Sequence, residues 1–193
     1  MTTLRFLGAT QQVTGSCYLL ESKSFKVLLE CGMIQSEHKP ESASAGLFSF
    51  DPQNIDAVVL SHAHLDHSGL LPALVREGYR GPVYVTTPTQ DLLEVMLKDA
   101  AFIQQKDIEW ENKKRLRSGK QPIEPVYDID DVEHALTHVL ALDYAQRSEI
   151  IQGVEIIFRD AGHIIGSAIV EMWLTDHHKT QNRVLSGEGG ESW

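Results

Sequence analysis

Cysteine is scarce in this chain of 193 residues, which contains only Cys17 and Cys31. The two do not form a Cys-x-x-Cys pair, and two cysteines cannot supply a disulfide framework. We interpret both as small buried residues of a cytosolic protein, where thiols stay reduced.

Positive charge is also scarce. The chain has 17 Lys and Arg residues against 27 Asp and Glu residues, which gives a formal net charge of −10. Phosphate contacts need clustered Lys and Arg, so this balance argues against a simple RNA- or DNA-binding module. It leaves open a nuclease in which metal ions and a local basic groove hold the phosphates.

Long apolar runs and targeting segments are lacking as well. The N-terminal residues Met1–Phe6 do not combine a basic region with a following apolar region, so no signal peptide is indicated. No apolar run approaches the length of about 20 residues that a membrane helix needs. We therefore expect a cytoplasmic protein with no membrane partner.

The remaining composition is that of an ordinary globular protein. Hydrophobic residues make up 42% of the chain and charged residues 23%. The length suits a single domain with a substantial core, so we expect residues 1–193 to form one domain.

Hydrophobic patterning predicts a β-rich opening, alternating strands and helices in the middle, and a β-rich end. We expect strands at 4–7, 17–21, 26–30, 55–60, 83–86, 154–158, 168–174 and 183–185, and helices at 70–75, 90–117 and 130–140. The run Ile55–Leu60 has the composition of a strand that is buried on both faces. This order of elements predicts a layered α/β (α+β) fold.

The long predicted helix ends in a cluster of basic residues. Their position at the end of the helix favours a solvated helix end that complements the helix macrodipole, and phosphate binding is the alternative interpretation. The residues are Lys113, Lys114, Arg115, Arg117 and Lys120.

The segment Ser61–Leu70 carries the chemistry of the chain. His62 and His64 leave the buried strand two residues apart, and in extended backbone such side chains share a face and can reach one ion. Asp66 and His67 follow where the chain turns into a helix, so they can serve a second ion or orient the ligands of the first.

Imidazole and carboxylate ligands together suit zinc, manganese or iron. Because no cysteine takes part, the set is typical of a catalytic site, in which one position stays open for water, rather than a sealed structural site. A second segment, Asp160–Ala168, contains glycines that let the backbone turn closely and deliver His163 to a shared site.

The pattern His62-x-His64-x-Asp66-His67 resembles the signature of the metallo-β-lactamase superfamily. The resemblance implies an αββα sandwich with zinc, usually two ions, at the edge of two facing sheets; manganese is an alternative. It implies that His62, His64 and His163 bind the first metal and that Asp66 and His67 bind the second. Asp66 is also the implied catalytic residue, which positions the attacking water.

Longer blocks resemble one branch of this superfamily, the β-CASP nucleases that process RNA and DNA. The blocks are Gly8–Thr10 with Val13–Cys17, Leu29–Gly32, the histidine segment, Tyr127 with Asp131–Glu133, and Ala161–Ala168. The implied function is hydrolysis of RNA phosphodiester bonds at a dinuclear metal site, with RNA as the partner.

The chain departs from the family pattern at two positions. Glu30 stands where the family often has aspartate before Cys-Gly. Glu188 is the candidate for the carboxylate that bridges both metals, although it is one methylene longer than the usual aspartate. The chain ends at Trp193, so the resemblance covers an N-terminal half that stops before the β-CASP insertion.

Two alternatives stay open. One is another hydrolase of this fold, such as a thioesterase of the glyoxalase II kind. The other is a non-catalytic fragment that associates with itself. Half of a sandwich would leave one apolar sheet face without a partner sheet, so we expect a homo-oligomer that covers this face.

Overall fold

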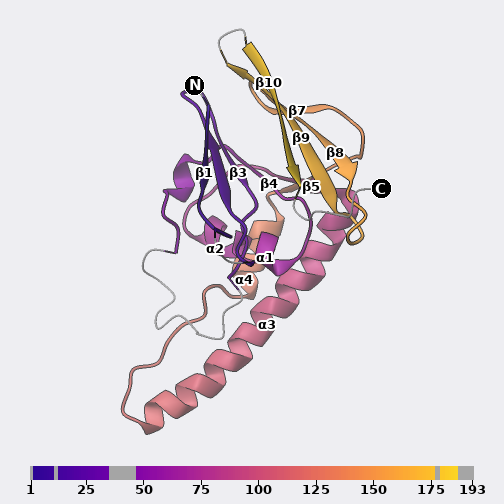
Figure 1. Ribbon diagram of the computed structural model, residues 1–193. Coiled ribbons are helices and arrows are strands. Elements are labelled where there is room, and N and C mark those ends of the chain that lie inside the picture. The colour runs from indigo at the N-terminus through magenta and orange to yellow at the C-terminus, as the bar shows by residue number, and fades with distance from the viewer. Residues whose placement is uncertain (1, 11–12, 35–46, 177–178, 187–193) are drawn as a thin grey trace.

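The computed structural model describes residues 2–10, 13–34, 47–176 and 179–186. Its strands form two sheets whose faces pack against each other, and one long helix extends away from both (Figure 1). The strands are β1 (Thr3–Phe6), β2 (Tyr18–Glu21), β3 (Lys26–Leu29), β4 (Ala57–Val59), β5 (Val83–Thr86), β6 (Val139–Leu142), β7 (Ser148–Ile151), β8 (Val154–Asp160), β9 (Ala168–Asp176) and β10 (Lys179–Ser186). The helices are the 3-10 turn Pro52–Asn54, α1 (Leu65–Ser68), α2 (Leu71–Arg76), α3 (Thr87–Arg117) and α4 (Ile129–Leu136).

The first sheet has the strand order β1-β2-β3-β4-β5-β6. Its first three strands pair antiparallel, and the pairs from β3 to β6 are parallel. The three residues of β4 are fully buried, as expected for a strand covered on both faces. Because β4 lies inside a parallel region, the segment that follows it emerges at the carboxyl edge of the sheet.

The two faces of the first sheet are covered by different partners. Alternate strand residues such as Leu28, Val58 and Val83 pack with α2, α3 and α4 in one apolar cluster. Their neighbours, such as Val27 and Val59, pack with the second sheet in another cluster. This alternation is the period of two that a strand imposes on its side chains.

The second sheet is antiparallel, in the order β10-β9-β8-β7. It contributes Ile156, Phe158, Val170 and Met172 to the cluster between the sheets. The described residues therefore form three layers, namely helices, first sheet and second sheet, which is part of the αββα sandwich that the family resemblance implies.

The inner faces of the two sheets cover each other, so the sheet face that we expected to lack a partner sheet is paired. The outer face of the second sheet carries charged side chains around Trp173. The Arg147 guanidinium lies 4.2 Å from the Trp173 ring centroid and pairs with Glu155. Arg159 pairs with Glu171 at 3.2 Å. Oligomerisation stays a prediction. The reason given for it, an apolar sheet face without a partner sheet, does not apply to the inner faces.

The helix prediction for 130–140 is wrong at its end. α4 begins behind a capping box made by Asp128 and Asp131, but it stops at Leu136. The chain then enters β6 at Val139, which pairs with Val83 of β5. The patterning missed β6 and β7 because each strand has only four residues and short apolar runs do not distinguish strand from helix.

The long helix begins three residues earlier than predicted. The Thr86 side chain accepts a hydrogen bond from the backbone of Thr89, and proline occupies the first turn. This is a normal N-terminal cap for a helix. None of the helices in the described ranges is long and apolar enough to cross a membrane.

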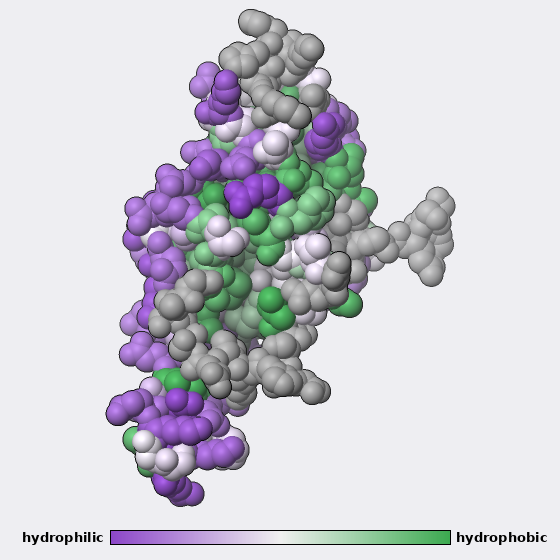
Figure 2. Space-filling model, turned by 60° about the vertical axis from the view of Figure 1, so that its left-hand side comes forward, coloured by the Kyte–Doolittle hydropathy of each residue, from purple (hydrophilic) through white to green (hydrophobic). Residues whose placement is uncertain are grey.

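Figure 2 shows hydrophobic side chains grouped over the body of the molecule, with hydrophilic ones at the rim. The projecting end of α3 is mostly hydrophilic and carries a few hydrophobic side chains on its surface.

Candidate metal centre

The site lies where β4 ends at the carboxyl edge of the first sheet. Leu60 continues the ladder by donating its backbone amide to the Tyr84 carbonyl at 3.0 Å. The Ser61 carbonyl accepts from the amide of Ala168 in the second sheet at 2.8 Å. The chain then enters α1, with His64 as the residue before the helix. The histidines are therefore fixed at a point where both sheets meet.

Three histidines converge on one point. Nε2 of His62 lies 3.1 Å from Nδ1 of His64, and Nε2 of His163 lies 3.2 Å from the same atom. One nitrogen from each ring can be chosen so that all three lie within 4.8 Å of one another. Three nitrogens bound to one tetrahedral zinc at 2.0–2.1 Å would lie about 3.3–3.4 Å apart. The separations of 3.1 and 3.2 Å come close to this value, whereas the three nitrogens as a set lie within 4.8 Å, so the rings would close slightly around such an ion.

The exposure of the three rings increases across the site. His62 is only 1% exposed, His64 is half-buried, and His163 is exposed. A site built in this way has a closed inner wall and an open outer side. An open position is what a catalytic ion needs for water or substrate.

Burial determines the protonation state of His62. Desolvation, together with the neighbouring rings of His67, His64 and His163, lowers the pKa of His62 to about 3. Its Nδ1 lies 2.8 Å from the Ser61 hydroxyl, which turns Nε2 towards the other histidines. The ring is therefore neutral at pH 7, which is the form that binds metal.

Asp66 and His67 stand beside this cluster on α1. His67 is 3% exposed, and its ring centroid lies 4.2 Å from that of His62. Its Nε2 lies 3.6 Å from a carboxylate oxygen of Asp66, whose side chain is 19% exposed. The structure thus brings all five described candidate ligands to one edge, three of them within ligand distance of one another.

Glu30 lies behind the site and is completely buried. Its carboxylate accepts from the Ser61 amide at 3.1 and 3.3 Å, and one oxygen lies 3.7 Å from Nδ1 of His67. The backbone of Glu30 is left-handed, with φ of 61°. The longer side chain that departs from the family pattern therefore still reaches both His67 and the segment that carries His62.

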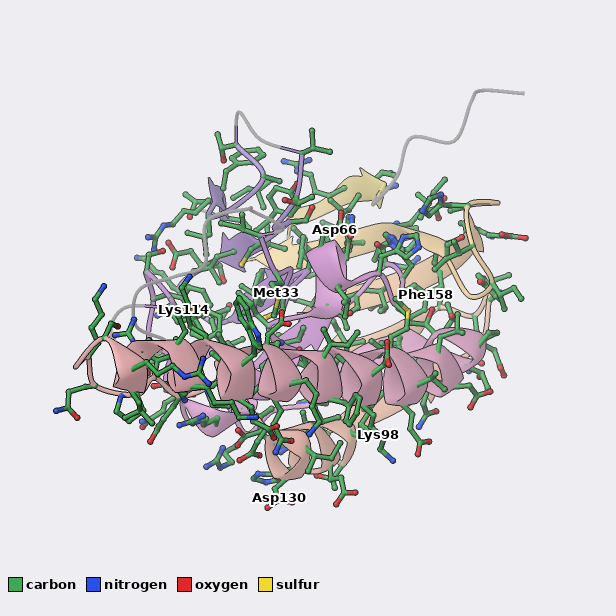
Figure 3. The ribbon with its side chains drawn as sticks, turned by 90° about the horizontal axis from the view of Figure 1, so that it is seen from below. Met33, Asp66, Lys98, Lys114, Asp130 and Phe158 are labelled. Carbon is green, nitrogen blue, oxygen red and sulfur yellow. The ribbon has the colours of Figure 1, made fainter. Side chains whose placement is uncertain are left out.

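Gly32 explains why Cys31-Gly32 accompanies the histidines. A Cβ atom at Gly32 would lie 1.7 Å from the Asp66 carbonyl oxygen, so only glycine lets the chain pass α1 this closely. Figure 3 places Met33 and Asp66 on the same side of α3. Backbone hydrogen bonds fix α1 from this segment and from the glycine-rich opening: Cys31 to His67 (2.7 Å), Met33 to Leu65 (2.8 Å) and Ser16 to Asp66 (2.8 Å).

The loop that carries His163 is anchored to α3. The carbonyl of Gly166 accepts from the hydroxyls of Thr86 and Thr89, at 2.6 and 2.8 Å. The amide of His163 donates to the Ser167 hydroxyl at 3.1 Å. Sequence reasoning missed both threonines, because they follow a different strand and no local signal links them to the loop.

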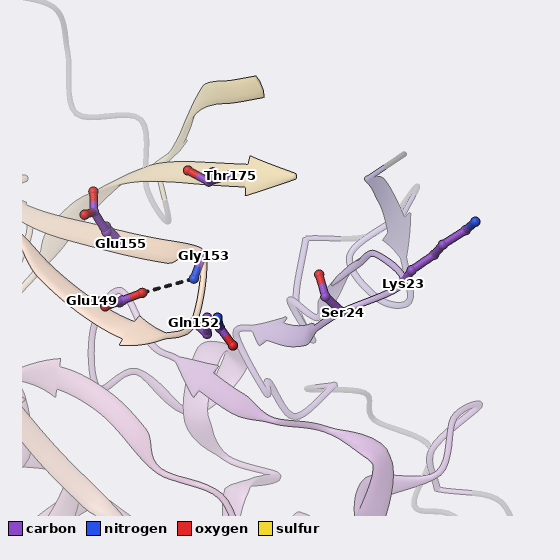
Figure 4. A pocket seen from close by; sticks show the side chains of 7 residues that line it. All are labelled: Lys23, Ser24, Glu149, Gln152, Gly153, Glu155 and Thr175. Atoms are coloured by element: carbon purple, nitrogen blue, oxygen red, sulfur yellow. Dashed lines mark hydrogen bonds between the residues drawn. The ribbon is translucent and has the colours of Figure 1, made fainter. Parts of the chain in front are cut away.

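A cavity of about 810 Å³ opens beside His64 and His163. Its walls include Leu92 and Met96 of α3 and the exposed Ile165. A second cavity of about 680 Å³ lies between the β2–β3 and β7–β8 turns (Figure 4). It is lined by Glu149, Glu155 and other residues that include no histidine or cysteine, so it offers none of the chemistry of the first.

The family of the chain follows from residues 19–185, which match the model described as "Metallo-beta-lactamase superfamily domain". The chain belongs to the metallo-β-lactamase superfamily. Solved metallo-β-lactamases share its fold. BJP-1 of Bradyrhizobium japonicum has a TM-score of 0.56 at 15% identity, over 98% of this chain and 61% of that one. FEZ-1 of Legionella gormanii has a TM-score of 0.55 at 18% identity, over 98% and 62%.

More similar sequences are found among curated proteins. Ribonuclease TTHA0252 of Thermus thermophilus is 42% identical over 163 residues, which are 84% of this chain and 33% of the relative. Transcription termination factor FttA of Methanococcus maripaludis is 34% identical over 172 residues, 89% of this chain and 25% of the relative. The chain thus spans a third or less of the length of these relatives. The matches confirm the resemblance to the RNA-processing branch that the sequence blocks indicate.

His62, His64 and His163 converge and His67 lies beside them, which is the arrangement that the signature implies. Their roles as metal ligands stay predictions. Glu188 lies outside the described residues, as do His38, His177 and His178. The remaining histidines, His134 and His138, lie next to each other away from the candidate metal centre, with ring centroids 5.5 Å apart and planes tilted by 53°.

Proposed function

We propose that this chain carries the metal-binding site of a hydrolase that cleaves RNA phosphodiester bonds. The convergence of His62, His64 and His163 carries the proposal, because three imidazoles with an open outer side fit a catalytic zinc ion. The matches to a ribonuclease and to termination factors support RNA as the substrate.

Asp66 and His67 would hold a second ion, with Glu188 as its bridging ligand. Zinc is the proposed metal, with manganese as the alternative for a mixed imidazole and carboxylate set. Bound there, the metal would supply a Lewis acid that lowers the pKa of water and neutralises phosphate charge.

The side chains of this chain would supply proton transfer and would position the metal ligands. Asp66 is partly exposed on α1, so its carboxylate can accept a hydrogen bond from the attacking water and take its proton. His67, 3.6 Å away, orients that carboxylate. His62 is held in place by Ser61, and the Gly166 anchor fixes the loop of His163.

The test is cleavage of a labelled single-stranded RNA beside hydrolysis of a thioester, each with zinc, with manganese and with EDTA. We expect metal-dependent cleavage of the RNA only. Hydrolysis of the thioester alone would replace the proposal by the glyoxalase II-like alternative.

Metal content separates an enzyme from a non-catalytic fragment. We expect His163→Ala to lose zinc and cleavage together, whereas His134→Ala, a histidine replaced away from the site, keeps both. Equal zinc content in the two variants would contradict the assignment of His163.

Three further expectations stay proposals. Residues 1–193 would form one N-terminal domain ahead of a β-CASP insertion, the protein would act in the cytoplasm, and it would be a homo-oligomer. Light scattering at micromolar concentration tests the last of these, and a monomer would contradict it.

A further inference from the structure

The outer half of α3 has no core to pack against. All five buried residues of this helix lie between Thr89 and Ala101, although the helix continues to Arg117. The remaining 16 residues are about 24 Å long at 1.5 Å per residue. Figure 1 shows this part of α3 extending away from both sheets. Packing against the core therefore does not explain which side chains this outer part of α3 presents to solvent.

One side of α3 forms a continuous stripe that starts at the metal centre. Its members are spaced alternately four and three residues apart, so they lie along one side of the helix. This α3 stripe consists of Leu92, Met96, Asp99, Ile103, Lys106, Trp110, Lys113 and Arg117. Leu92 and Met96 line the cavity beside His64 and His163. The stripe therefore leads outward from the proposed reaction site.

The outer half of the stripe combines basic and aromatic side chains. Trp110 is 66% exposed, and the Lys114 ammonium lies 5.7 Å from its ring centroid. Phe102, at the edge of the stripe, is 59% exposed and has Lys106 at the same distance. Lys106 also pairs with Glu109 at 3.1 Å, at the surface. Beyond Asp99 the stripe has no acidic member, although the chain as a whole has a net charge of −10.

Other contacts of this helix lie on its other sides. Asn112 exchanges two hydrogen bonds of 2.8 Å with the backbone of Ile123, and Arg115 donates to the Gln121 carbonyl. The returning segment is thus held away from the stripe. In Figure 3, Lys114 extends to the side of α3 on which Asp66 lies, and Lys98 extends to the opposite side.

The composition of the stripe identifies the occupant. A helical protein partner would need apolar residues at these alternating positions. Lys106, Lys113 and Arg117 occupy three of the last four instead. Exposed aromatic rings among cations are the means by which proteins bind single-stranded nucleic acid, with bases stacked on the rings and phosphates near the cations.

We infer that the α3 stripe binds the RNA strand that extends from the metal centre, with Trp110 as a stacking platform and Lys113 and Arg117 as phosphate contacts. The inference rests on the proposed function for the identity of the strand. It adds a binding surface on α3 that begins at the cavity of Leu92 and Met96.

The test is binding of a fluorescein-labelled, 12-nucleotide single-stranded RNA, followed by anisotropy over a range of salt concentrations. EDTA is present, so that no RNA is cleaved. We expect Trp110→Ala to weaken binding about tenfold, because stacking on one aromatic side chain has an effect of that order. We expect Lys113→Glu to weaken binding several-fold at low salt and to reduce the slope of log K against log salt by about 0.7. Asp99→Asn removes the negative charge in the stripe, so it should strengthen binding.

Two control variants match these changes. Leu116→Ala removes an exposed apolar side chain from another side of the same helical end. Lys23→Glu makes the same charge change in the β2–β3 turn. Both should bind RNA like the original chain. Circular dichroism checks that each variant keeps its helix content.

The outcomes separate this inference from the proposed function. If the original chain cleaves RNA and the stripe variants bind like the controls, the inference is wrong and the proposed function stands. If binding depends on Trp110 and Lys113 but no RNA is cleaved with any metal, the inference stands and the proposed function fails. Absence of RNA binding by the metal-free original chain would overturn the inference, and absence of cleavage with every metal as well would overturn both.

Discussion

Replacement of Glu30 should separate folding from metal binding in this site. Glu30→Ala removes the carboxylate that accepts from the Ser61 amide at 3.1 and 3.3 Å. The amide would then be buried without this acceptor, which costs about 1–3 kcal/mol of the free energy of unfolding. For a chain of this size, that corresponds to a fall in the melting temperature of roughly 2–12 °C.

Glu30→Gln supplies the matched comparison. Its side-chain carbonyl keeps an acceptor for Ser61, so metal-free Glu30→Gln should recover most of the stability that Glu30→Ala loses. It lacks the carboxylate near Nδ1 of His67, which lies 3.7 Å away. Loss of a group that orients a metal ligand lowers metal affinity about 10- to 100-fold, so both variants should bind zinc more weakly.

Glu30→Asp tests the length of the side chain. The family residue is one methylene shorter, and the left-handed backbone of Glu30 fixes its origin, so the carboxylate would retract from Ser61. We expect stability between those of Glu30→Gln and Glu30→Ala. Urea unfolding of the metal-free proteins and zinc competition against a chromophoric chelator are the two measurements. If Glu30→Ala unfolds like the original chain, or if Glu30→Gln binds zinc unchanged, the role assigned to Glu30 is refuted.

Three further predictions concern the same region. Because the pKa of His62 is about 3 in the folded chain and near 6.5 in the unfolded chain, acid should destabilise the metal-free protein. As pH falls from about 6.5 towards 3, only the unfolded chain gains this proton, and the free energy of unfolding falls by up to about 1.4 kcal/mol per pH unit; His62→Gln should flatten that part of a urea-unfolding profile. Gly32→Ala places a methyl group against the Asp66 carbonyl, so it should displace α1 and reduce both stability and zinc affinity in the same assays, and an unaffected variant would contradict the close approach. Thr89→Val removes the 2.8 Å hydrogen bond to Gly166 and leaves the Thr86 side chain that caps α3, so it should weaken zinc binding more than it weakens folding, and the reverse order would argue for a purely structural role.

The parts of the fold that the sequence predicts depend on local pattern. The buried run that contains β4 and the turn into α1 are both evident in 55–70, because composition alone marks a strand covered on both faces. The candidate ligands His62 and His64 are two residues apart on the chain, so their spacing alone predicts that they share a site.

The parts that the sequence did not predict depend on contacts between distant segments. β6 exists because Val139 pairs with Val83, and its short apolar run is otherwise compatible with a helix. The Thr86 anchor of the His163 loop joins residues 80 positions apart. The pairing of the inner sheet faces likewise came from the three-dimensional packing, whereas the sequence indicated an open face.

The histidine cluster has a consequence for the thermal stability of the protein. His64 and His163 are 99 residues apart in sequence, and they come from the first sheet and from a loop of the second. A metal ion held by both would act as a reversible cross-link that closes this long loop in the folded state. Stabilisation by such a ligand grows with its free concentration relative to its Kd. The melting temperature of this protein would therefore vary with the supply of zinc, in addition to the stability that the apolar cluster between the sheets provides.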